Sequence, residues 1–79
     1  MTARVTVYTR AGCPSCALAE ADVARICAEL GHGWTAVDVD ADVELRIEYG
    51  DRVPVIMIEG REHGFWKGDE ERFRAALAK

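Results

Sequence analysis

The hydrophobic pattern of the chain changes from strand-like to helix-like within a few residues of its start. Residues 4–9 read RVTVYT, where valines alternate with β-favouring residues, as is typical of a strand. From Pro14 to about Leu30 the composition is helical, rich in Ala, Leu, Glu and Arg. Pro14 suits the first turn of a helix, and Gly31 suits its end. The sequence therefore predicts a strand that leads directly into a helix.

One face of this predicted helix is apolar, and the opposite face is charged. The apolar residues recur at helical spacing, at Ala19, Val23, Ile26, Cys27 and Leu30. Such a stripe indicates that the helix packs along its length against a sheet.

The rest of the chain continues the alternation of strands and helices. Residues 34–39 (WTAVDV) predict a second strand, and residues 55–58 form an apolar run typical of a strand buried on both faces. A turn at residues 59–60 and a return over residues 62–66 predict a hairpin. The last helix is expected to begin at Gly68-Asp69, with Asp69 as its cap.

Residues 43–49 (VELRIEY) give two conflicting signals. Their apolar residues alternate strictly, which by itself favours a strand. Asp40 or Asp42 offers an N-cap, however, Gly50 offers a C-cap, and the spacing creates favourable i,i+4 pairs. We predict a short helix.

The resulting order is strand, helix, strand, helix, strand, strand, helix. It implies an α/β layered structure whose first half is parallel. A chain of 79 residues is expected to be one domain, residues 1–79, and 49% hydrophobic against 30% charged residues is ordinary for a globular protein.

Charge and apolar patterning limit the location and the partners. A formal net charge of −4 argues against general affinity for nucleic acid. The N-terminal residues lack the pattern of a secretory signal, and no run reaches the roughly 18 apolar residues of a membrane span. We therefore expect a cytoplasmic protein that does not bind membranes. In the cytoplasm, disulfides are usually transient and catalytic.

Cys13 and Cys16 form a Cys-x-x-Cys pair at the strand-to-helix junction. A zinc site would need Cys27 and His32 as further ligands, but Cys16 and Cys27 would lie about 16 Å apart along one helix. No metal is therefore expected. A structural disulfide and a reactive dithiol both remain compatible with the spacing. Cys27 itself lies on the apolar stripe, as a small buried residue would.

A dithiol at this place would have two unequal sulfurs. Unpaired N–H groups and the helix dipole at a helix N-terminus favour the thiolate form of a cysteine. Arg10, three residues upstream, is expected to add positive charge near Cys13. Cys16 lies one turn further into the helix and is expected to be less exposed. These positions predict that Cys13 attacks a disulfide and that Cys16 resolves the intermediate.

Two stretches resemble glutaredoxins. YTRAGCPSC resembles the pattern Y-[ST]-K-x-x-C-P-Y-C, with Arg10 in place of lysine and Ser15 in place of tyrosine. VPVIMIEG, which begins at Val53, resembles V-P-x-[VI]-F-[VI]-x-G. The resemblance covers nearly the whole chain and implies a thioredoxin fold, β-α-β-α-β-β-α, with a four-stranded mixed sheet.

The resemblance also implies roles for single residues. The Val53–Pro54 bond would be cis and packed against the cysteine pair, and the Val53 backbone would bind a substrate peptide. Gly68 and Asp69 would belong to the same substrate site. The residues that would support the active site are Tyr8, Arg10, Pro14 and Ser15. The paired glycines that precede this helix cap in glutathione-dependent glutaredoxins are absent, as in a bacterial glutaredoxin-like subgroup.

These features predict a thiol–disulfide oxidoreductase that reduces protein or low-molecular-weight disulfides. It would hold no cofactor and would be recycled by an external reductant, either a small thiol or a flavoprotein reductase. It would act as a monomer. The alternative is a thioredoxin-fold binding module, either non-catalytic or carrying an iron–sulfur cluster between two chains.

Overall fold

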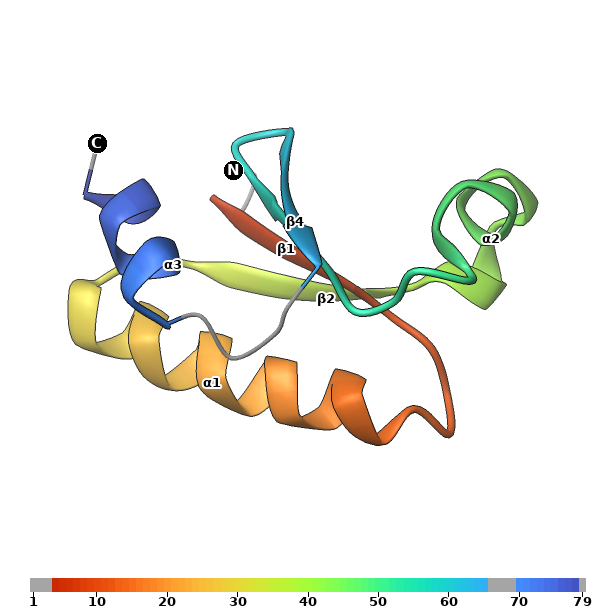
Figure 1. The fold of residues 1–79 in the computed structure, drawn as a ribbon, viewed down its shortest axis with the longest axis horizontal. Helices are drawn as coiled ribbons and strands as arrows, with labels where there is room; N and C mark the ends of the chain where they lie inside the picture. Colours follow the sequence, from red (N-terminus) through yellow and green to blue (C-terminus); the bar gives the residue numbers. More distant parts are fainter. Residues whose placement is uncertain (1–3, 66–69, 79) are drawn as a thin grey trace.

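A four-stranded sheet with helices on both faces makes up the protein (Figure 1). The structure is a computed structural model that describes residues 4–65 and 70–78. In chain order the elements are β1 (Val5–Thr9), α1 (Pro14–Leu30), β2 (Trp34–Asp38), the 3-10 helix η1 (Val39–Ala41), α2 (Val43–Tyr49), β3 (Val55–Ile58), β4 (Arg61–Phe65) and α3 (Glu70–Leu77).

The sheet is mixed, with the strand order β2-β1-β3-β4. β1 pairs in parallel with β2, from Val5 opposite Trp34 to Thr9 opposite Asp38, and antiparallel with β3. β3 and β4 form an antiparallel hairpin. This arrangement confirms the predicted thioredoxin fold and the predicted order of strands and helices.

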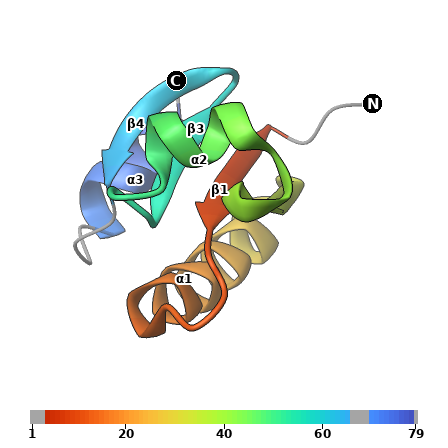
Figure 2. The same cartoon turned by 90° about the vertical axis from the view of Figure 1, so that its right-hand side faces the viewer.

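The main core lies between the sheet and the helices α1 and α3. Its members come from β1, α1, β3 and α3: Val5, Val7, Val23, Ile26, Cys27, Ile56, Phe73 and Leu77. α2 lies on the other side of β1 (Figure 2). There the Tyr49 ring stacks on the ring of Tyr8, with 4.6 Å between ring centroids. Because side chains alternate along β1, Val5 and Val7 face the main core while Tyr8 faces α2.

The stripe of α1 is buried as predicted at four of its five positions, and Leu30 is the exception, at 41% exposed. The helix ends directly after Leu30, where Gly31 adopts a left-handed conformation with φ of 75°. The N–H groups of Gly31 and His32 both donate to the Cys27 carbonyl. Leu30 is thus the last helical residue, at the end of the stripe.

Residues 43–49 form the predicted helix, so the helix caps prevail over the alternating pattern. The Asp42 carboxylate accepts hydrogen bonds from the N–H groups of Glu44 and Leu45, at 2.8 and 3.4 Å. The apolar residues Val43 and Ile47 are nevertheless 61% and 79% exposed. No residue of α2 is buried.

Two predicted strand boundaries were wrong. β2 ends at Asp38 rather than at residue 39, because the Asp38 carboxylate accepts a hydrogen bond from Asp40 N–H at 2.9 Å and starts η1. β4 begins at residue 61 rather than at residue 62, since Glu59 and Gly60 both have positive φ and close a two-residue hairpin loop. Position 66 and the predicted cap at Gly68-Asp69 lie outside the described residues.

In the part of the chain that the structure describes, no helix combines the length and the apolar character needed to cross a bilayer.

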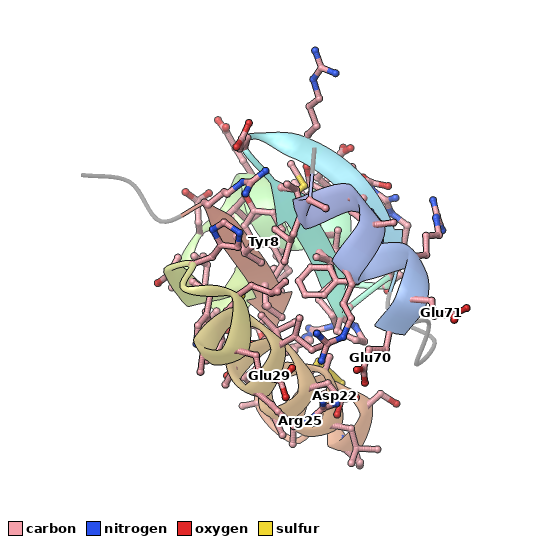
Figure 3. All side chains as sticks on the ribbon, turned by 90° about the vertical axis from the view of Figure 1, so that its left-hand side faces the viewer. Tyr8, Asp22, Arg25, Glu29, Glu70 and Glu71 are labelled. Atoms are coloured by element: carbon pink, nitrogen blue, oxygen red, sulfur yellow. A yellow bond between two sulfur atoms is a disulfide. The ribbon has the colours of Figure 1, made fainter. Side chains whose placement is uncertain are left out.

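The Glu70 carboxylate joins α3 to α1 on the surface (Figure 3). It accepts from Arg25 of α1 at 2.7 Å and from Arg74 of α3 at 2.8 Å. Hydrogen bonds from these two guanidinium groups, Arg25 first, lower the pKa of Glu70 from 4.5 to about 2.

We predict that Glu70→Gln changes the pH dependence of folding stability. A carboxylate with a lowered pKa in the folded state stabilises the fold above pH 4.5 and loses this effect as the pH falls towards 2. The variant should therefore unfold more easily than the wild type at pH 7, and the difference should shrink below pH 4.5. Urea unfolding followed by circular dichroism at several pH values measures this.

The matched control is Glu71→Gln, because Glu71 points away from α1 (Figure 3). The difference in free energy of unfolding between Glu71→Gln and the wild type should vary less with pH. If the free energies of unfolding of the wild type and Glu70→Gln changed in parallel between pH 7 and pH 3, the stabilising role given to the Glu70 carboxylate would be wrong.

Gly50, at the end of α2, is required for steric reasons rather than for a left-handed conformation. Its φ of −52° is ordinary, but a Cβ there would overlap the Arg46 carbonyl oxygen. We predict that Gly50→Ala lowers the free energy of unfolding by about 1–3 kcal/mol, as overpacking does. Gly33→Ala is the control, since a Cβ at Gly33 meets nothing within 4 Å. Equal effects of the two substitutions in urea unfolding would refute this explanation.

Candidate active site

Cys13 is the N-cap of α1. Its backbone is extended, with φ of −106° and ψ of 103°, and its Sγ accepts a hydrogen bond from the N–H of Cys16 at 3.1 Å. Pro14, which has no N–H to satisfy, follows in the first turn. The sulfur therefore occupies the place where a serine or aspartate oxygen usually caps a helix. A negative charge on this atom would face the positive end of the helix dipole.

Cys16 forms a disulfide with Cys13, and the two Cα atoms are 5.2 Å apart. Cys16 is 1% exposed, whereas Cys13 is half-buried, which agrees with the expected difference in depth. The reason is helical periodicity, because Cys16 continues the buried stripe that runs through Ala19 and Val23. Cys13, one turn earlier, lies where this stripe meets the surface.

The chain on either side of Cys13 carries no charge from Ala11 to Ala19. Residues 11–19 read AGCPSCALA, and the first turn of α1 contains no acidic residue. Pro14 and Ser15 are exposed, as is Leu18 at 68%. No neighbouring carboxylate in this turn opposes a thiolate at Cys13. Whether Pro14 and Ser15 support the active site stays a prediction.

Arg10 binds partners other than the cysteines. Its Nε donates to the Asp40 carboxylate at 3.0 Å, and its Nη1 donates to the Gly50 carbonyl at 3.2 Å. The hydrogen bond and charge of Asp40 raise the pKa of Arg10, with further contributions from Asp51 and Asp38. The positive charge predicted to act on Cys13 is thus held among carboxylates.

Tyr8 lies at the end of β1 with its ring against Tyr49 of α2. Arg52 lies over the other ring of this pair, with its Cζ 5.2 Å from the Tyr49 centroid. This stacking places the half-buried Tyr8 ring against α2. Its predicted role beside the dithiol stays a prediction.

The Val53–Pro54 peptide bond is cis, as the resemblance implies. Pro54 is fully buried, and Val53 is half-buried in the loop that leads into β3. Gly68 and Asp69, the other predicted substrate residues, lie outside the described residues.

The nominal zinc ligands are separated in the fold. Cys27 belongs to the core, and the His32 ring lies 3.1 Å from the Arg4 guanidinium. Among residues 4–65 and 70–78, no cluster of three or more His, Cys, Asp or Glu side chains is arranged to hold a metal. A surface hollow of about 620 Å³ lies near Arg4, His63 and Ala76, at the opposite end of β1 from Cys13.

Sequence reasoning did not identify Asp40, Gly50 and Tyr49 as neighbours of the site. All three come from residues 38–50, which adjoin the end of β1 only because β2 pairs in parallel with β1. The sequence predicts this parallel pairing, and the pairing is the signal from which these neighbours could have been found. It places the segment after β2 beside the segment after β1.

Comparisons with known proteins agree with this architecture. The family described as Glutaredoxin-like domain (DUF836) matches residues 4–78. An uncharacterized protein of Mycobacterium tuberculosis, Rv0508, is 41% identical, over 96% of this chain and 84% of the relative. Protein XcR50 from X. campestris, whose X-ray structure is known, is 36% identical, with a TM-score of 0.76 over 94% of this chain and 95% of that one.

A glutaredoxin from Brucella melitensis, with a known solution structure, is 32% identical to this chain. The TM-score is 0.62, and the match covers 96% of this chain and 79% of the Brucella protein. Together with the match over residues 4–78, these likenesses show that the chain belongs to the glutaredoxin-like domain family.

Proposed function

We propose that this protein is a thiol–disulfide oxidoreductase that reduces disulfides through Cys13 and Cys16. The observation that carries the proposal is the unequal cysteine pair at the start of α1. A half-buried sulfur caps the helix, and a buried sulfur lies within bonding distance of it. Such a pair offers an accessible nucleophile and a protected second thiol.

In the first step, the Cys13 thiolate attacks one sulfur of the substrate disulfide. A bond forms between Cys13 and this sulfur, the substrate S–S bond breaks, and the other substrate sulfur leaves as a thiolate that takes a proton from water. The Cys16 N–H, which donates to Cys13 Sγ, and the N-terminal end of α1 favour the attacking thiolate.

In the second step, Cys16 loses its proton and attacks Cys13 Sγ. The mixed disulfide breaks, the second substrate sulfur leaves as a thiolate, and the Cys13–Cys16 disulfide forms. The substrate gains two electrons, and the dithiol loses two. An external reductant, either a small thiol or a flavoprotein reductase, then returns two electrons to the pair.

For a peptide substrate, we propose that the Val53 backbone holds the chain beside Cys13. Val53 lies in a loop at the carboxyl-terminal side of β1, before the buried Pro54, and is partly accessible. This edge also carries the uncharged first turn of α1, with Pro14, Ser15 and Leu18 exposed. A protein disulfide flanked by apolar residues fits it better than a highly charged small molecule. We place the reaction in the cytoplasm, where the pair would be kept reduced.

We predict that Cys16→Ser traps the substrate on Cys13, whereas Cys13→Ser lowers disulfide exchange to the uncatalysed rate. Without Cys16 the mixed disulfide has no internal thiol to resolve it, and without Cys13 the nucleophile is absent. Mass spectrometry of the intact protein after reaction with a peptide disulfide measures the adduct, and the release of peptide thiol gives the rate.

Cys27→Ala is the control, because Cys27 lies in the core away from the pair. It should retain exchange and show at most a modest loss of stability. Full activity of Cys13→Ser, or no adduct with Cys16→Ser, would overturn the proposed function.

The source of electrons is tested separately. The oxidised protein is mixed with glutathione, with a second low-molecular-weight thiol, or with thioredoxin reductase and NADPH, and free thiols are counted over time. The fastest of these reactions identifies the class of reductant.

A further inference from the structure

We propose that Arg10 is a positioning residue that fixes the loop bearing Cys13 relative to the loop bearing Val53. This inference rests on the proposed function, in which a peptide substrate must contact both. It differs from the role expected from the sequence, where the charge of Arg10 would activate the thiolate.

The guanidinium joins three segments that are remote in the sequence. Arg10 follows β1, Asp40 lies in η1, and Gly50 ends α2. Nε binds the Asp40 carboxylate at 3.0 Å while Nη1 binds the Gly50 carbonyl at 3.2 Å. Because the donors of a guanidinium lie in one rigid plane, both bonds together fix the relative placement of the three segments.

The positions of these bonds in the sequence link them to the two reacting loops. Arg10 lies three residues before Cys13, and Gly50 lies three residues before Val53. Three residues of chain span at most about 11 Å. The bond from Arg10 to the Gly50 carbonyl is therefore a short connection between the attacking sulfur and the backbone proposed to hold the peptide.

The Gly50 carbonyl is well suited to this contact. The last carbonyl groups of a helix have no partner within the helix and need donors from elsewhere. Arg52 supplies two such donors: its backbone N–H donates to the Tyr49 carbonyl, and its side chain donates to the Glu48 carbonyl. Arg10 supplies the donor for the next carbonyl. The end of α2 is thus held on one side by its own chain and on the other by the Cys13 loop.

The electrostatic surroundings argue against a main role for Arg10 in thiolate activation. Asp38, Asp40 and Asp51 all act on the guanidinium, and Asp40 binds it directly. The Arg10 and Asp40 side chains are 39% and 35% exposed, so solvent screens both charges. The hydrogen bond from Cys16 N–H and the end of α1 already stabilise a thiolate at Cys13 without this charge.

Asp40 provides a matched pair of substitutions that separate geometry from charge. Asp40→Asn removes the charge but keeps an oxygen that accepts from Arg10, whereas Asp40→Ala removes both. Arg10→Lys keeps the positive charge but cannot make the two bonds in their fixed geometry. Circular dichroism and thermal unfolding first establish that each variant is folded.

The experiment uses two reactions of the reduced full-length protein at about 0.15 M ionic strength, where charges more than roughly 8 Å apart are screened. Alkylation of Cys13 by iodoacetamide as a function of pH reports the thiolate fraction and needs no docking. Reaction of the Cys16→Ser background with a peptide disulfide reports attack on a substrate that must contact both loops.

If Arg10 positions the loops, Asp40→Ala and Arg10→Lys should each slow the peptide reaction about tenfold, a modest misplacement effect. Asp40→Asn should react with the peptide at nearly the rate of the parent protein, and the alkylation profiles of all variants should coincide with that of the parent. If Arg10 instead activates Cys13 by its charge, Asp40→Asn and Asp40→Ala should both shift alkylation to lower pH, and Arg10→Lys should react normally. That result, or unchanged peptide rates in every variant, overturns the inference.

Failure of the proposed function gives a different result. To detect it, the parent protein is also mixed with hydroxyethyl disulfide, a small disulfide that needs no docking. The parent would then react with neither this compound nor the peptide disulfide. If the parent reacts with both and the variants match it, only the role of Arg10 is refuted.

Discussion

The burial of β1 is the constraint on which the rest of the structure depends. This strand pairs with β2 on one edge and β3 on the other, and Val5 and Val7 are completely enclosed beneath α1 and α3. Each such side chain contributes about 1.5–3 kcal/mol through the area it removes from water. Because α1 starts a short loop after β1 and must cover the same face, the start of α1 is held at the carboxyl end of the strand.

The chemistry of the cysteine pair follows from that packing. Cys16 is the first buried position of the stripe that attaches α1 to the sheet, so its depth is set by the core. Cys13 precedes the first helical residue, where the chain still faces solvent. The two sulfurs differ in access because one helix passes from surface to core within a single turn. No separate element is needed to create the difference.

Local signals in the sequence predicted the element order, the start of α1 and the helix over residues 43–49. These features depend on neighbours close in the chain, such as the Asp42 carboxylate and the N–H groups two and three residues after it. The partners of Arg10 could not be predicted, because they depend on how β2 and α2 return to the end of β1. The burial expected of Leu30 and two strand boundaries failed at local turns, where a single residue decides where an element ends or begins.

Cys27 illustrates what burial does to a third thiol in so short a chain. It is fully enclosed in the core, and this burial raises the pKa of its thiol, so it is neither accessible nor readily ionised in the folded protein. It lies eleven residues after Cys16, about 16 Å further along the helix axis. Once the pair is reduced, an alkylating reagent therefore finds Cys13 accessible in the folded chain and reaches the buried Cys16 and Cys27 only after unfolding. The count of modified cysteines reports the integrity of the core, independently of any enzymatic assay.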